Sequence, residues 1–125
     1  AGIILCAVGD AEWVDDESLM DAVTALSGSG PAYLFHLIES MTAAGVTAGL
    51  SPALSEKLAR QTVIGAAALA DNQSSISAAT LRQNVTSPGG TTAAALTILM
   101  APDTGLTPLL TTAILAARER SAELG

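Results

Sequence analysis

Cysteine, aromatic residues and positive charge are all scarce in this chain of 125 residues. Cys6 is the only cysteine, which excludes an intramolecular disulfide and any zinc site built from several cysteines. Aromatic residues make up 2% of the chain, so a core must be built from Ala, Leu, Val and Ile, which favours closely packed helices. Lys and Arg number 5 against 12 Asp and Glu, a net charge of −7 that argues against nucleic acid or an anionic membrane surface as partners.

Long hydrophobic runs are absent too, although 50% of the residues are hydrophobic. The longest, such as residues 63–70, fall well short of the ~20 residues that a membrane helix needs, which excludes a membrane-spanning protein. The apolar start of the chain lacks the positive residues of a signal peptide. High hydrophobicity without a membrane span indicates apolar surface that is buried against another chain or domain.

From residue 15 onward the apolar periodicity is helical and predicts an all-α domain of about six helices. Asp15 and Asp16 are expected to cap the first helix, over residues 17–26, and Gly49 to end the second, over residues 31–48. Residues 27–31, Ser-Gly-Ser-Gly-Pro, are expected to break the first helix and to permit a sharp reversal. The remaining helices are expected to begin at residues 52, 77, 91 and 107.

One face of the helix that begins at residue 52 combines small and apolar side chains, which permits the close approach of another helix. We expect it to be an interface. Its members are Leu54, Leu58, Thr62, Gly65, Ala66 and Leu69.

Residues 8–14 alternate between apolar and polar, with Ala11 and Trp13 on one face and Asp10 and Glu12 on the other, which predicts a short strand. A strand needs partners for its backbone, and no later segment has a strand pattern. Its sheet is therefore expected in an N-terminal region that this chain lacks. The absence of an initiator Met fits a piece of a longer chain.

The segment over residues 85–92, Val-Thr-Ser-Pro-Gly-Gly-Thr-Thr, carries the most chemical information. Two glycines after a proline, directly before a helix, leave backbone N–H groups at a helix N-terminus, an arrangement that binds an anion such as a carboxylate. The alternative is a plain turn with threonine capping. Geometry alone leaves both interpretations open.

Three motifs, over residues 21–33, 61–67 and 81–92, occur in an order and spacing that closely resembles the C-terminal part of pyrroline-5-carboxylate reductase. The resemblance implies an N-terminal Rossmann domain that binds NADPH or NADH, and a helical domain that intertwines with a second subunit in a homodimer, with further assembly into ring-like oligomers. Residues 1–14 would be the remnant of the nucleotide-binding domain, with residues 1–8 ending its last helix. Residues 15–125 would be the helical dimerisation and substrate-binding domain.

The implied reaction is the reduction of 1-pyrroline-5-carboxylate to L-proline with NAD(P)H, the last step of proline biosynthesis, in the cytoplasm. This fragment alone is expected to be inactive. On the family pattern the Thr92 hydroxyl contacts the ring nitrogen as the catalytic group, and the N–H groups of Ser87, Gly90 and Thr91 hold the carboxylate. No metal takes part. The implied substrate-binding residues are Asn84, Val85, Ser87, Gly89, Gly90 and Thr91.

The other glycine-rich segment, over residues 27–31, is not a dinucleotide-binding fingerprint, because Tyr33 stands where a third glycine or alanine is required. In the family this turn faces the nicotinamide, so Ser27 and Gly30 are expected near the cofactor. A plain helix–helix turn is the alternative. His36 is the only histidine, which makes it a poor metal ligand.

Two other functions stay open. The first is a non-catalytic helical dimerisation or binding module, in which the turn at residues 87–90 is purely structural. The second is a related reductase with the same two-domain plan, acting on a different imine or on a 2-oxo acid.

Overall fold

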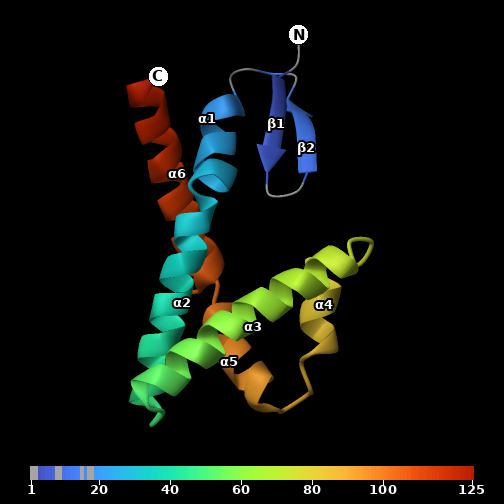
Figure 1. Cartoon of the computed structure of the whole chain (residues 1–125), viewed down its shortest axis with the longest axis vertical. Coiled ribbons are helices and arrows are strands. Elements are labelled where there is room, and N and C mark those ends of the chain that lie inside the picture. The colour runs from blue at the N-terminus through green and yellow to red at the C-terminus, as the bar shows by residue number, and fades with distance from the viewer. Residues whose placement is uncertain (1–2, 8–9, 15, 17–18) are drawn as a thin grey trace. The chain divides into compact units, whose positions relative to one another are not determined.

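The computed structural model describes residues 3–7, 10–14, 16 and 19–125 (Figure 1). It consists of two compact units, one formed by Ala1–Tyr33 with Met100–Gly125 and the other by Leu34–Leu99. From residue 19 onward the described chain is helical, so the predicted all-α class is confirmed. The elements in chain order are β1 (Ile3–Ala7), β2 (Asp10–Val14), α1 (Met20–Val23), the π-helix η2 (Thr24–Gly28), α2 (Gly30–Thr47), α3 (Pro52–Asn72), α4 (Ala78–Asn84), α5 (Thr91–Leu99) and α6 (Leu106–Leu124).

The N-terminal strands form an antiparallel pair in which Ile3 lies opposite Val14 and Ala7 opposite Asp10. The strand expected over residues 8–14 corresponds to β2, while Val8 and Gly9 lie outside the described residues. The expectation that residues 1–8 end a helix is wrong for Ile3–Ala7, which is strand β1. Its β-branched isoleucines favour a strand, and pairing with β2 satisfies backbone groups of both strands within the chain.

The described part of the first helix, α1, begins at Met20, and residues 17 and 18, where the sequence analysis places its start, lie outside the described residues. Its N-cap residue is Leu19, which makes no side-chain capping bond, and the Leu19 N–H donates to the Asp16 carbonyl at 3.0 Å. Asp15 lies outside the described residues. Asp16 therefore contributes its backbone to the start of α1, whose first residue is Met20.

The sharp reversal expected at residues 27–31 is absent from the structure. The chain stays right-handed and helical from η2 through Ser29, with φ −87° and ψ −15°, into α2. Among the described residues positive φ occurs at Gly49 and Gly89, and not at Gly28 or Gly30. Gly28 and Gly30 thus have backbone angles that any L-amino acid can adopt. The chain forms the wider π-helix η2 at this point and does not reverse its direction.

In the unit that contains both chain ends, α6 packs along α1 and η2 (Figure 1). The Ser121 hydroxyl donates to the Asp21 carboxylate at 2.8 Å across this contact. Ala25 of η2 is completely buried. The position of the π-helix is therefore fixed by its packing against α6.

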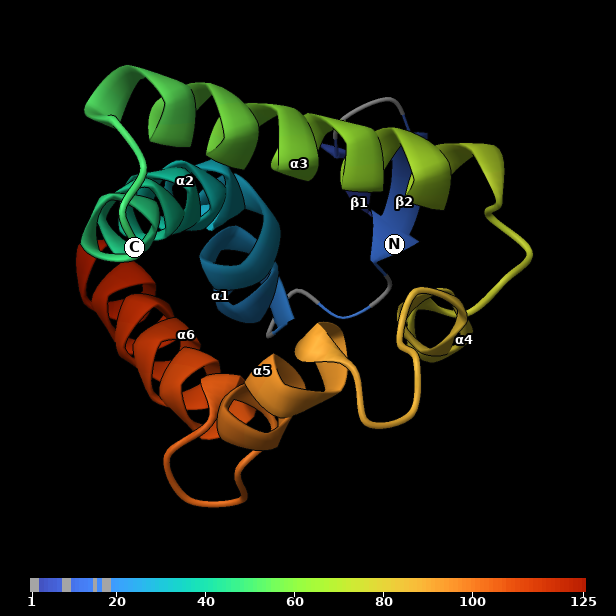
Figure 2. The same ribbon diagram turned by 90° about the horizontal axis from the view of Figure 1, so that it is seen from below.

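In the other unit, α2 and α3 are joined by a short turn and make their close contact next to it (Figure 2). The predicted glycine cap is confirmed: Gly49 has φ +115°, and the Gly49 and Leu50 N–H groups donate to the Val46 and Gly45 carbonyls, as in a Schellman motif. The Ser51 hydroxyl accepts the Leu54 N–H at 3.3 Å and caps α3. Both ends of the turn are thus fixed by local chemistry.

The contact between α2 and α3 depends on small residues. The buried Ser55 hydroxyl donates to the Thr42 carbonyl at 2.7 Å, and Gly45 lies directly against Ser55. The face of α3 that the sequence marks as an interface is uncovered in the single chain, where Leu54, Leu58 and Leu69 are 45%, 48% and 40% exposed. α3 thus uses one face within the chain and leaves the more apolar one open.

None of the helices in the described part of the chain is both long and apolar enough to cross a membrane.

Candidate functional site

The segment between α4 and α5 forms a tight turn. The Gly90 N–H donates to the Ser87 carbonyl at 3.0 Å, with Pro88 and Gly89 between them. Gly89 has φ +71°, so the turn shows the type II pattern of proline followed by a left-handed glycine. The Thr86 hydroxyl donates to the Arg82 carbonyl at 2.6 Å and ties the turn to the end of α4.

The turn leads directly into α5, whose N-terminus carries the donors that an anion needs. The first helical bond runs from the Ala94 N–H to the Gly90 carbonyl at 3.2 Å. The N–H groups of Thr91, Thr92 and Ala93 precede this bond, as the first donors of every α-helix do. The Gly90 N–H, by contrast, is used within the turn. A Cβ at Gly90 would lie 3.3 Å from the Ser87 carbonyl oxygen, so glycine keeps this side of the turn narrow.

The position of Thr92 in the first turn also frees its hydroxyl. Several other helical threonine hydroxyls donate to the carbonyl four residues earlier, as that of Thr97 does to Ala93 at 3.1 Å and that of Thr62 to Leu58 at 2.7 Å. Four residues before Thr92 lies Pro88, which precedes the helix. Within the described residues the Thr92 hydroxyl makes no hydrogen bond, so it remains able to donate and to accept one.

The predicted substrate-binding residues and Thr92 all lie on this one continuous segment, from the end of α4 to the start of α5. Most are exposed, with Val85 63% exposed, while Gly90 and Thr92 are half-buried. The two cofactor-proximal candidates, Ser27 and Gly30, belong to the other compact unit, where Ser27 lies in η2 and Gly30 begins α2. In this single chain Ser87, Pro88 and Gly89 of the turn are exposed.

A residue that the sequence analysis assigned no role emerges from the structure. The Tyr33 hydroxyl donates to the Ala25 carbonyl at 2.6 Å, across the junction of η2 and α2. A π-helix has no sequence pattern of its own, so periodicity could not have revealed this bond. The available signal was a tyrosine two residues after a proline in the first turn of a helix.

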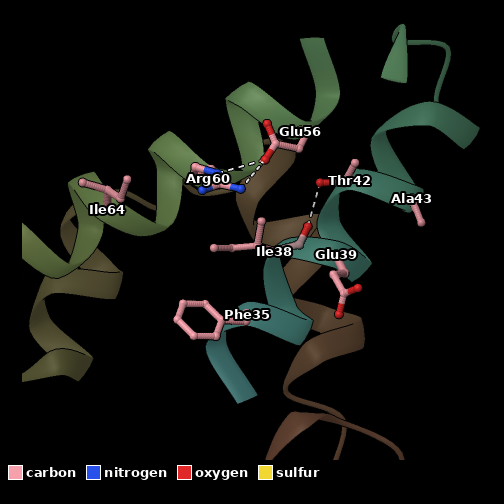
Figure 3. A pocket seen from close by; sticks show the side chains of 8 residues that line it. All are labelled: Phe35, Ile38, Glu39, Thr42, Ala43, Glu56, Arg60 and Ile64. Carbon is pink, nitrogen blue, oxygen red and sulfur yellow. Dashed lines mark hydrogen bonds and ion pairs between the residues drawn. The ribbon is translucent and has the colours of Figure 1, made fainter. Parts of the chain in front are cut away.

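A separate groove opens between α2 and α3, with a volume of about 580 Å³ (Figure 3). Glu56 and Arg60 of α3 form an ion pair at 2.6 Å on one wall. His36, the only histidine, lies 3.3 Å from Glu39 on α2. None of the predicted site residues lines the groove. Its lining residues are Phe35, Ile38, Glu39, Thr42, Ala43, Glu56, Arg60 and Ile64.

Within the described part of the chain, no three histidine, cysteine or acidic side chains gather in a way that could hold a metal ion. Nor do residues 27–30 form a loop for the phosphates of a dinucleotide, because they are helical and have no positive φ. The described part of the chain carries a helix start whose first N–H groups are not used by the helix, and extensive uncovered apolar surface. Together they define the class of the protein as a helical domain with apolar surface available to another chain.

Comparison with known proteins identifies the family. Residues 17–124 match the family model for pyrroline-5-carboxylate reductase dimerisation. The chain is 51% identical over 124 residues to a pyrroline-5-carboxylate reductase of Pseudomonas aeruginosa, covering 99% of this chain and 44% of that protein. The chain therefore belongs to the pyrroline-5-carboxylate reductase dimerisation family, and it spans less than half the length of this relative.

Solved structures agree with this assignment. A pyrroline-5-carboxylate reductase from Coxiella burnetii superposes with a TM-score of 0.83 at 42% identity, covering 90% of this chain and 41% of that chain. The pyrroline carboxylate reductase of Plasmodium falciparum, solved with NADP bound, gives a TM-score of 0.78 at 39% identity and covers 88% of this chain and 41% of that one. The helical fold is thus that of the matching part of these reductases.

Proposed function

We propose that this chain is the helical C-terminal part of a reductase that converts 1-pyrroline-5-carboxylate to L-proline with NAD(P)H, in the cytoplasm. The supporting observation is the turn at residues 87–90, which leads into α5 with its first-turn N–H groups unused by the helix. Residues 1–14 would belong to a nucleotide-binding domain and residues 15–125 would form the helical dimerisation and substrate-binding domain. Alone, this fragment is expected to be inactive.

In the proposed site the N–H groups of Ser87 and Thr91 hold the substrate carboxylate, helped by the positive end of the α5 dipole. Gly89 supplies the left-handed turn, and Gly90 shapes it through its bond to Ser87. The carboxylate then fixes the orientation of the ring. Asn84 and Val85, which adjoin this turn at the end of α4, line the ring side.

The Thr92 hydroxyl is the group proposed to face the ring nitrogen. Reduction adds a hydride to the imine carbon and a proton to the nitrogen, so that the C=N bond becomes C–N and the nitrogen becomes an amine. A hydroxyl that both donates and accepts can support the nitrogen in either state. NAD(P)H supplies the hydride, and the described residues provide no phosphate-binding loop for it. We place that loop in the nucleotide-binding domain and assign Ser27 and Gly30 only a contact near the cofactor.

We further propose that two chains form an intertwined homodimer, which can assemble into ring-like oligomers. Among the described residues only Ala25 and Ala59 are buried hydrophobic side chains, too few for a stable core. Large apolar side chains such as Phe35 and Ile64 are 65% and 52% exposed along the groove between α2 and α3. Burial of this surface in a second copy would supply the missing core.

The experiment is NAD(P)H oxidation with 1-pyrroline-5-carboxylate, by the complete gene product and by this 125-residue chain side by side. Activity is expected only in the complete protein, in samples whose mass by light scattering is that of a dimer or larger. A monomer at micromolar concentration contradicts the dimer. Turnover of a six-membered cyclic imine or a 2-oxo acid in preference to the five-membered ring would point to the related reductase instead.

Thr92→Val in the complete protein tests the site itself. We expect kcat/KM to fall by about 100-fold, as when one preorganised hydrogen-bond donor is removed from an active site. Thr97→Val is the matched control, because Thr97 lies on the same helix and its hydroxyl is bonded to Ala93. Unchanged turnover in Thr92→Val would make the hydroxyl a spectator and favour the non-catalytic module.

A further inference from the structure

The π-helix η2 departs from α-helical bonding over Thr24–Gly28, up to its junction with α2. The Ser29 N–H donates to the Thr24 carbonyl, five residues earlier, at 2.9 Å. Two residues later comes Pro31, which has no N–H and whose ring would collide with the Ser27 carbonyl in a regular α-helix. The wider π turn just before Pro31 accommodates the ring without a break in the helix. The sequence of this segment thus explains its geometry.

The wider turn changes the partner of the Ala25 carbonyl. In an α-helix the Ser29 N–H would donate to Ala25, but here it reaches Thr24 instead. The Ala25 carbonyl is bonded by the Tyr33 hydroxyl at 2.6 Å, and Ala25 itself is completely buried. A buried carbonyl without a partner is unfavourable, so the tyrosine hydroxyl stabilises the π turn specifically.

The same segment is fixed on its other side by α6. The Asp21–Ser121 hydrogen bond lies before η2, and the Tyr33–Ala25 bond spans its far end. Between these two bonds lies Ser27, whose side chain is exposed, and just beyond η2 lies the half-buried Gly30. An exposed polar segment held at both ends is suited to meeting a ligand in one fixed orientation. π-helical turns recur at functional sites.

We propose that Tyr33 is a positioning residue of the reductase, whose hydroxyl holds the π turn so that Ser27 and Gly30 meet the nicotinamide nucleotide in the correct place. This inference rests on the proposed function. It assigns Tyr33 no contact with substrate or cofactor. Tyr33 acts through the Ala25 carbonyl and the backbone that follows it.

Tyr33→Phe in the complete protein removes only the hydroxyl. We expect KM for NAD(P)H to rise about tenfold as the turn relaxes, because small displacements of positioning groups have large kinetic effects. KM for 1-pyrroline-5-carboxylate should stay within about twofold, since the turn at residues 87–90 is held by its own hydrogen bonds. Thr47→Val is the control, because it removes another helix hydroxyl, bonded to the Ala43 carbonyl on an exposed face. A purely structural role would lower thermal stability without separating the two KM values.

Pro31→Ala is a second variant that does not depend on the tyrosine. It restores an N–H at residue 31 and so permits the α-helical register, which should raise the nucleotide KM without lowering the melting temperature. If Tyr33→Phe does not fold, the nucleotide KM of Pro31→Ala alone tests whether the π turn positions the nucleotide. An active wild-type protein whose two variants both keep wild-type nucleotide KM overturns the inference. An inactive wild-type protein overturns the proposed function instead, and with it this inference.

Discussion

The two segments in which proline lies among glycines, residues 27–31 and 87–90, have nearly the same composition and opposite structures. In the first, glycines precede Pro31, and the chain remains helical through a π turn. In the second, Pro88 comes first, Gly89 has φ +71°, and the segment is a turn between α4 and α5. Proline favours the second position of a turn and glycine the third, whereas proline after glycine suits a first helical turn. The order of the residues decides the outcome.

The largest effect is expected where glycine is required by its dihedral angle. Gly89→Ala places a Cβ on a residue with φ +71°, which destabilises the native turn by about 1–2 kcal/mol. Relief of that strain would distort the proposed carboxylate site, so we expect kcat/KM of the complete protein to fall by about 100-fold. The measurement is steady-state kinetics with thermal unfolding. Wild-type kinetics would show that the left-handed turn has no part in substrate binding.

The sequence predicted most helix boundaries because local chemistry determines them. The serine caps before α3 and α4 and the glycine cap after α2 lie where their side-chain and backbone preferences place them. The strand β1 and the π turn were missed for different reasons. Residues 3–7 have no alternation and depend on pairing with β2, and the π turn depends on the Tyr33–Ala25 bond, which joins residues eight positions apart.

The candidate site was predicted only as a list of neighbours. Residues 84–92 are adjacent in sequence, so their meeting on one turn needed no tertiary structure. The side chains that would cover the turn come from other parts of the protein, and sequence periodicity does not reveal which ones they are. The resemblance therefore supplied the roles, while the structure supplied the bond from Gly90 to Ser87 and the unbonded hydroxyl of Thr92.

A similar loss of stability, without a predicted loss of activity, is expected where glycine is required by contact rather than by its dihedral angle. A Cβ at Gly45 would collide with the Ser55 hydroxyl at the crossing of α2 and α3. We expect Gly45→Ala to destabilise the protein by about 1–2 kcal/mol, as overpacking does after the gain in helix propensity is subtracted. In a Ser55→Ala background the penalty should shrink, because the colliding oxygen is gone. Equal penalties in both backgrounds, measured by chemical denaturation, would place the strain elsewhere.

The smallest effect, of opposite sign, is expected at Gly28 in the helical segment. Its φ is not positive, and a Cβ there would lie 3.7 Å from the Thr24 methyl carbon, an ordinary contact. Gly28→Ala should therefore stabilise the protein by about 0.5–1 kcal/mol, because alanine loses less backbone entropy on entering a helix. The measurement is the free energy of unfolding of Gly28→Ala and of Gly89→Ala by chemical denaturation, each compared with the wild type. If both alanines destabilise, the segment around Gly28 requires glycine for a reason other than its backbone angle, and the distinction between helical and left-handed glycines drawn from these two segments is wrong.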